Sequence, residues 1–309
     1  MSSDLATIEA VPVTTALGVF AKVSRNWSVR IGAAVLVFLV MIAIAAPWMG
    51  TVDPAVMDGA VMNVLPGVSG EFTLLDGHAI RHHFWMGTDS FGRDIWSRVL
   101  YGTRISLVVG LFVAVVSLFF GSLAGLCAGY LRWVDGILMR VMDGLMAIPG
   151  ILLAIALVAA WGASLTTVIV AIAIPEIPRV TRLVRSLVLS IREEPYVEAA
   201  VALGTPTWKI MLRHILPNAI APLIVQGTFT CGSAILLESI LSFLGVGLPS
   251  EIPTWGNIMA EGRVQFNQFP HNVLFPGIFL ALTVLAVNML GDGLRDTLDP
   301  KFNKRGGVK

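Results

Sequence analysis

The chain has 309 residues, of which 56% are hydrophobic and only 13% are charged, and its net charge is +1. A soluble domain carries about 25% charged residues, so this composition excludes an ordinary soluble fold and indicates an all-α integral membrane protein. The balanced charge, without a basic run or an aromatic platform, gives no indication of nucleic-acid binding.

Six apolar segments predict membrane-spanning helices. A bilayer offers no water to unpaired backbone N–H and C=O groups, and a helix pairs these groups within one segment. The uncharged run at 144–175 is too long for one span, and the turn at 161–164 divides it into a hairpin of two. The other four spans are expected at 31–49, 105–131, 219–237 and 273–290. The first of these is too long for a signal peptide, so we expect a retained anchor.

Six spans place both termini on one side of the membrane, and the basic residues indicate which side. Of the 21 lysines and arginines, 16 fall on the side of the termini. The five on the other side are Arg81, Arg93, Arg98, Arg104 and Arg263. The positive-inside rule therefore predicts cytoplasmic N- and C-termini. We expect a cytoplasmic tail at 1–30, the first span and an external loop at 31–103, and a domain with five spans at 104–309.

Charges of alternating sign precede the second span, at Asp89, Arg93, Asp94 and Arg98, with Gly92 among them. Their spacing is close to a helical turn and predicts an amphipathic helix along the outer surface, held by local ion pairs. No nucleophile or pocket accompanies these charges, so we expect no catalytic site here or elsewhere.

No residue pattern predicts a cofactor, a bound metal or a disulfide. Cys127 and Cys231 lie in apolar runs, where buried thiols are expected. His78 and His82 have helical spacing, but their loop-like context and lack of further ligands do not favour a metal site.

Three glycines in the second span, Gly121, Gly125 and Gly129, recur at intervals of four. Such a small-residue ridge lets another helix approach closely. We favour packing within this subunit, with an interface between subunits as the alternative.

Three polar residues inside or beside the spans are candidates for a translocation pathway: Glu176, Glu238 and Asn288. A local ion pair with Arg179 is the favoured reading of Glu176. Glu238 precedes the apolar stretch 239–248, which is too short to span and predicts a separate re-entrant or surface helix; a structural polar contact is favoured there. Asn288 is expected to connect helices rather than to bind a ligand.

The charged segment near 190–217 falls on the cytoplasmic side and predicts two short helices. Residues 196–203 suit the first, and Gly204 can close it in the left-handed conformation. Thr205 fits an N-cap and Pro206 the first position of a second helix, whose apolar side carries Trp208, Met211 and Leu212. Pro217 marks the next span. Small alanines would let another protein approach this loop.

Motifs along the chain resemble those of one transporter family. Glu198-Ala199-Ala200, then Gly204 and Ile215-Leu216-Pro217, resemble the EAA loop of ABC importer permeases, with His214 where the general pattern has isoleucine. GTDSFGRD at 87–94, GxRxSL at 102–107, LSFLG at 241–245, GDGLRD at 291–296 and LDP at 298–300 narrow the match. Together they resemble the C-type permease subunit of dipeptide, oligopeptide and nickel importers.

The resemblance implies a multi-pass permease of a bacterial inner membrane, forming a heterodimer with a second homologous permease. Two cytoplasmic ABC ATPases and an external solute-binding protein would complete the transporter. The ATPase would contact Glu198, Ala199, Ala200, Gly204, Thr205, Pro206, Ile215 and Pro217. The chain has no G-x-x-x-x-G-K-[ST] sequence, so ATP hydrolysis is expected from a partner.

Peptides are the default cargo, with nickel chelates, glutathione, opines and sugars as alternatives. A secondary transporter working alone is a different class. It would predict several ionisable residues within the spans and inverted repeats, and the sequence favours neither.

Overall fold

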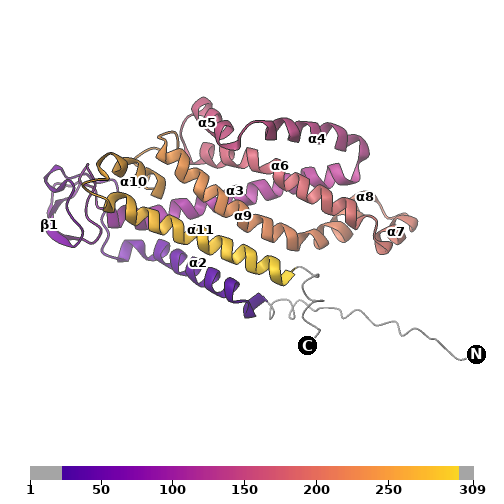
Figure 1. Ribbon diagram of the computed structural model, residues 1–309, viewed down its shortest axis with the longest axis horizontal. Helices are drawn as coiled ribbons and strands as arrows, with labels where there is room; N and C mark the ends of the chain where they lie inside the picture. The colour runs from indigo at the N-terminus through magenta and orange to yellow at the C-terminus, as the bar shows by residue number, and fades with distance from the viewer. Residues whose placement is uncertain (1–22, 299–309) are drawn as a thin grey trace, which may run out of the picture.

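The computed structural model describes residues 23–298, which form an elongated helical bundle (Figure 1). Most of the expected N-terminal tail, and residues 299–309, lie outside this range. The bundle contains α2 (Trp27–Ala45), α3 (Ile95–Tyr130), α4 (Arg132–Ala147), α5 (Gly150–Trp161), α6 (Leu165–Ile191), α9 (Leu216–Phe243) and α11 (His271–Leu298). The short helices α7 (Pro195–Ala202) and α8 (Thr207–Ile210) lie at one end, and α10 (Trp255–Gly262) lies at the other with the strands β1 (Val68–Thr73) and β2 (Ala79–Phe84).

Within residues 23–298, four helices are long and apolar enough to cross a membrane: Trp27–Trp48, Ile95–Tyr130, Thr207–Phe243 and His271–Leu298. The pair α4 and α5, bent by 88° at its break, would make a fifth span. The helix α6 is not among them, because three charged residues, Glu176, Arg179 and Arg182, lie within its first 18 residues and lower its apolar character. The structure is thus that of a multi-pass membrane protein, while the count of six spans stays a prediction.

The glycine ridge of α3 packs against α6 within this subunit. Three pairs face each other: Gly121–Val180, Gly125–Val184 and Gly129–Val188. A Cβ atom added at any of the three glycines would lie 2.5 or 2.6 Å from the valine Cβ, so only glycine permits this approach. The predicted intrasubunit packing is confirmed.

The helix α9 corrects one prediction. The sequence suggested a break at Glu238 and a separate helix over 239–248, but α9 continues through Glu238 to Phe243. The carboxylate of Glu238 accepts a hydrogen bond from the hydroxyl of Ser242, one turn further along, at 2.8 Å. Because this local bond satisfies part of the buried carboxylate, the acidic residue does not end the helix.

The external loop also departs from an all-α fold. Strands β1 and β2 form an antiparallel hairpin in which Val68 pairs with Phe84 and Thr73 with Ala79. Phe72 and Phe84 are fully buried beneath it. His82 lies on β2, so its spacing from His78 is not helical. The Asp-Gly dipeptide at 76–77 between two alternating runs is the hairpin signal that sequence reasoning missed.

Candidate functional site

The loop between α6 and α9 folds as two short helices around a tight turn. Gly204 takes the left-handed conformation, with φ of +73°, as predicted. Its N–H donates to Val201 O at 2.9 Å, and the N–H of Thr205 donates to Ala200 O at 3.1 Å. These two bonds make a Schellman motif, which satisfies the last carbonyls of α7 and fixes the direction of the chain leaving it.

Both short helices lie one residue away from their predicted starts. Pro195 begins α7, in agreement with the preference of proline for the first helical position. Pro206 is the N-cap of α8 with extended ψ of 142°, so Thr207 rather than Pro206 is the first helical residue and Thr205 is not a cap. From Thr207 the chain continues through a π-helical turn, Met211–Ile215, directly into α9.

One face of this loop is anchored in the bundle. Val197, Ile210 and Ile215 are at most 1% exposed and pack in one cluster with the α6 valines that face the glycine ridge. Asn218 of α9 donates to the hydroxyl of Tyr196 at 3.2 Å and to His214 O at 2.6 Å. The loop is therefore held to α6 and α9 on its inner face.

The other face of the loop presents apolar side chains to its surroundings. The exposed fraction is 85% for Leu203, 65% for Trp208 and 55% for Leu212. Large exposed apolar groups on a fixed loop are typical of an interaction surface. The sequence placed Trp208 and Leu212 on an apolar side but gave no signal for Leu203.

The predicted loop residues divide between the two faces. Those exposed are Glu198, Ala199, Gly204, Pro206 and Pro217, while Thr205 is half-buried. Ala200 and Ile215 are buried and support the loop from inside.

A second polar region follows α6 and α4. Glu176 is 5% exposed, and both of its carboxylate oxygens accept from Nη1 of Arg179 at 3.1 Å, which confirms the predicted local pair. Further along α6, Arg182 donates to Asp143 of α4 at 2.6 Å. Arg185 holds Asp135 of α4 through both carboxylate oxygens. These ion pairs tie α4, which is otherwise largely exposed, to α6.

The other two pathway candidates lie inside the helix bundle. Glu238 is fully buried, with its carboxylate against Ser242, so it is closed off from solvent in this conformation. Asn288 is half-buried on α11 and faces Gly232 of α9. The structure does not bring Glu176, Glu238 and Asn288 into one site.

The charged segment before α3 is buried, so the prediction of a surface helix there is wrong. Asp89, Arg93 and Arg98 are each at most 2% exposed, and α3 begins only at Ile95. Arg93 donates to Asp89 at 2.7 Å and also binds Glu261 of α10, which Arg98 contacts at 3.3 Å. The pair between Arg93 and Asp89 is local, as predicted, whereas the pairs to Glu261 are long-range and hold the segment inside the molecule rather than along its surface.

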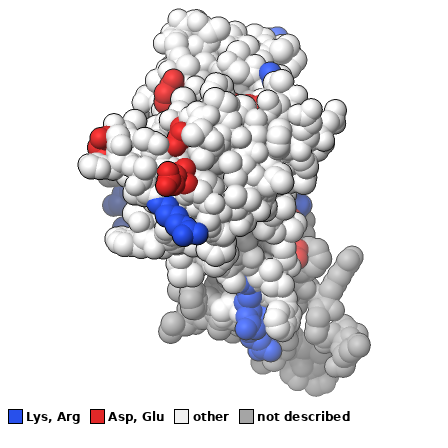
Figure 2. Space-filling model, turned by 90° about the vertical axis from the view of Figure 1, so that its left-hand side faces the viewer, with Lys and Arg blue, Asp and Glu red and all other residues white. Residues whose placement is uncertain are grey.

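Glu261 was missed by sequence reasoning, because no local pattern links it to arginines more than 160 residues earlier. Burial raises the pKa of its carboxyl, and the charges of Arg98 and Arg93 oppose that rise. In the same region, Asp94 caps α3 by accepting from Ser97 N at 2.9 Å. With these charges inside, the end of the molecule seen in Figure 2 presents a mainly uncharged surface with scattered acidic and basic groups.

Within residues 23–298, no group of three or more histidine, cysteine, aspartate or glutamate side chains could hold a metal ion. The charged residues of α4, α6 and the segment before α3 form ion pairs and a helix cap. Long apolar helices, internal ion pairs and a loop with an exposed apolar face define a multi-pass membrane protein.

Comparison with known proteins gives the family. The family described as binding-protein-dependent transport system inner membrane component matches residues 117–304, and the chain belongs to it. It is a multi-pass inner-membrane permease of the peptide-type ABC importers.

Curated relatives carry permease names. A probable peptide ABC transporter permease of Sinorhizobium fredii is 50% identical over 281 residues, covering 91% of each chain. A dipeptide transport system permease of Alkalihalophilus pseudofirmus is 44% identical over 284 residues, covering 92% of this chain and 89% of the relative. A glutathione transport system permease of Pectobacterium atrosepticum is 47% identical over 219 residues, covering 71% and 73%.

Proposed function

We propose that this chain imports peptides or glutathione-like solutes as one half of a permease heterodimer, driven by separate ABC ATPases that dock on the loop from α7 to α8. An external solute-binding protein delivers the cargo. The names of the relatives support the cargo class, and the absence of a phosphate-binding GxxxxGK[ST] sequence in the chain supports a separate source of ATP hydrolysis.

The observation that carries the docking proposal is the exposed apolar face of the anchored loop. Exposure of the apolar side chains of Leu203 and Trp208 to water is unfavourable, and burying either one in a partner contributes about 1.5–3 kcal/mol to the binding free energy. Because the inner face of the loop packs on α6, a partner bound to the outer face would move α6 with it. The geometry suits transmission of force as well as attachment.

The proposed topology has six spans, with α4–α5 as one bent span and α6 as another. The loop then lies in the cytoplasm, at the same end of the bundle as the start of α2 and the end of α11, which contact each other through Val29 and Gly293. The excess of lysine and arginine on that side supports this orientation.

We assign the polar face of α6 and α4 to the translocation pathway. The side chains of Arg179 and Arg182 are 58% and 46% exposed, and a charged group on a membrane-spanning helix is costly when it faces hydrocarbon. A water-filled path therefore suits this face better than lipid does. Glu176 acts by holding Arg179, and Glu238 and Asn288 contribute only if the helices rearrange.

Substitution of Leu203 by glutamate tests the docking surface. We expect Leu203→Glu to insert normally in the membrane but to weaken ATPase binding by about 2 kcal/mol, roughly thirtyfold, because the apolar contact is lost. Glu198→Lys and Gly204→Pro should uncouple uptake in the same way. The measurements are co-purification of the ATPase and ATP-driven uptake of a dipeptide and of glutathione into proteoliposomes containing the whole transporter.

The matched control is Leu75→Glu, because Leu75 is an equally apolar side chain that is 77% exposed at the opposite end of the molecule. It should retain ATPase binding. Normal ATPase binding and uptake in Leu203→Glu would refute the docking role, and uptake that proceeds without any ATPase would refute the importer function.

A further inference from the structure

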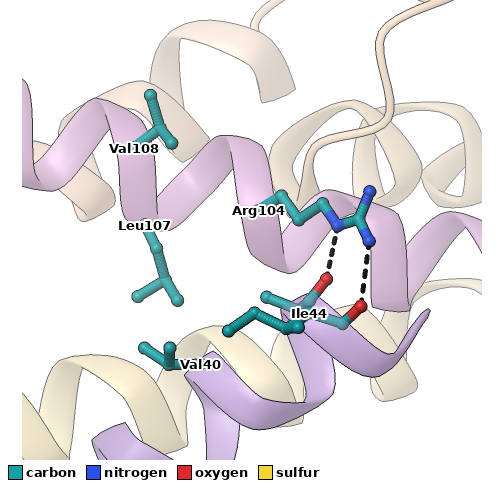
Figure 3. A pocket seen from close by; sticks show the side chains of 6 residues that line it. Val40, Ile44, Arg104, Leu107 and Val108 are labelled. Atoms are coloured by element: carbon teal, nitrogen blue, oxygen red, sulfur yellow. Dashed lines mark hydrogen bonds between the residues drawn. The ribbon is translucent and has the colours of Figure 1, made fainter. Parts of the chain in front are cut away.

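An open groove lies between the C-terminal part of α2 and the start of α3 (Figure 3). Its lining is Val40, Ala43, Ile44, Arg104, Leu107 and Val108. Five of these six residues are apolar, and Ile44 is 62% exposed at its edge. The groove is therefore hydrocarbon-like along its length, with one cation at its end.

Arg104 is fixed in place by the end of α2. Its Nε donates to Ala43 O and its Nη2 to Ile44 O at 3.2 Å, so it satisfies two carbonyls of the last helical turn (Figure 3). Its guanidinium also lies 4.9 Å from the centre of the Tyr101 ring. This arrangement holds the side chain in one orientation beside the groove.

The charge of Arg104 has no carboxylate partner within residues 23–298, in contrast to Arg93 and Arg98 at the same end of the molecule. Its two carbonyl acceptors carry only the partial negative charge of a helix C-terminus. A positive charge thus stands at the mouth of an apolar groove, where an anion would complement it.

Two tryptophans indicate the depth of Arg104 in the membrane. Trp27, the first residue of α2, is 70% exposed, and Trp48, three residues after the end of α2, is 79% exposed. Tryptophan side chains concentrate at the two membrane interfaces. Arg104 binds the carbonyls of residues 43 and 44, close to Trp48, so its guanidinium lies at the level of the lipid headgroups.

We propose that this groove binds one anionic phospholipid, with an acyl chain along Val40, Leu107 and Val108 and the phosphate at Arg104. Arginine is well suited to phosphate because its planar fork offers several N–H donors, and Nη1 is not used in either bond to α2. The lipid belongs to the outer leaflet, which rests on the proposed orientation of the chain. A helix of the partner permease fits less well, because its apolar side would bury the charge of Arg104 without compensation.

The test is native mass spectrometry of the full-length protein, titrated in detergent with phosphatidylglycerol or with phosphatidylcholine. Wild-type protein should retain one phosphatidylglycerol in preference to phosphatidylcholine. Arg104→Gln should weaken phosphatidylglycerol binding about fivefold, as expected for one basic residue near an anionic headgroup. Arg104→Lys keeps the charge and should bind the lipid nearly as well as the wild type.

Leu107→Trp gives a test that is independent of the bonds to α2, since it fills the groove while leaving Arg104 unchanged, and it should also reduce retention. Arg263→Gln is the matched control, because Arg263 likewise binds a carbonyl, Phe243 O, and lies over an aromatic ring but does not line the groove. Equal retention of the two lipids by the wild type would overturn the proposal. Undiminished phosphatidylglycerol binding in both Arg104→Gln and Leu107→Trp would overturn it as well.

Discussion

The close contact between α3 and α6 can be tested by a single methyl group. In Gly125→Ala the new Cβ would lie 2.6 Å from Val184 Cβ and 2.7 Å from Thr181 O, so the two helices must separate. Overpacking of this kind costs about 1–3 kcal/mol, against a gain of ~0.5–1 kcal/mol from replacing a helical glycine by alanine. We expect a net loss of about 1–2 kcal/mol in the free energy of unfolding.

The matched control lies on α4, where a Cβ at Gly136 would meet nothing within 4 Å. Gly136→Ala should leave stability unchanged or raise it slightly. Unfolding of both variants would be followed by circular dichroism in the same detergent, alongside ATP-driven uptake by the assembled transporter. Because the α6 valines also support the loop proposed to bind the ATPase, Gly125→Ala should lower uptake and Gly136→Ala should not.

A double substitution separates the steric effect from other causes. Val184→Ala removes the methyl groups nearest to residue 125, so Gly125→Ala with Val184→Ala should recover part of the lost stability relative to the sum of the two single changes. Rescue would be incomplete, because the Cβ atom of residue 184 and Thr181 O both remain close. Strict additivity, or a Gly125→Ala protein as stable as the wild type, would refute the role assigned to this contact.

Two further predictions concern the end of the molecule near α10. Glu261→Gln leaves Asp89 as the one carboxylate, within residues 23–298, that is paired with two buried arginines, and it should destabilise the protein by about 3 kcal/mol in thermal unfolding. Glu71→Gln, at an exposed position, should not, and equal stability of the two variants would count against the buried network. Hydrogen bonds from the backbone N–H of Ala60 and of Thr73 hold the pKa of Asp58 below its usual value of 3.8. The ionised carboxylate of Asp58 therefore stabilises the fold fully above that value, and this stabilisation is lost as the pH falls through the lower pKa of the folded protein. Asp58→Asn should reduce the dependence of unfolding stability on pH in the acid range. An unchanged dependence would contradict this.

Features encoded by local pattern were predictable from the sequence. The interval of four between Gly121, Gly125 and Gly129 places them on one helix face, so close packing followed directly. Gly204 closed α7 as expected, because few other residues adopt a positive φ at low cost. Glu176 and Arg179 are three residues apart on α6, which brings their side chains together in a helix.

Features set by distant contacts were not predictable in this way. The charges at Asp89, Arg93 and Arg98 have helical spacing, yet their position is decided by Glu261, which no local pattern connects to them. In the same manner, the exposure of Leu203 depends on how the turn at Gly204 directs the chain. The break expected at Glu238 is absent, because a serine one turn further along binds one oxygen of the carboxylate inside the helix.

The α6 valines connect the proposed docking surface to the membrane-embedded helices. Val180, Val184 and Val188 face the glycine ridge of α3 and belong to the same buried cluster as Val197 and Ile210 of the loop. An interior packed this closely does not deform continuously, so a displacement of the loop must move α6 or break the cluster. Since α6 is also joined to α4 by ion pairs, both helices that line the proposed pathway would respond to one movement at the loop. This is the mechanical reason to expect that changes at the ridge, far from the ATPase, impair uptake.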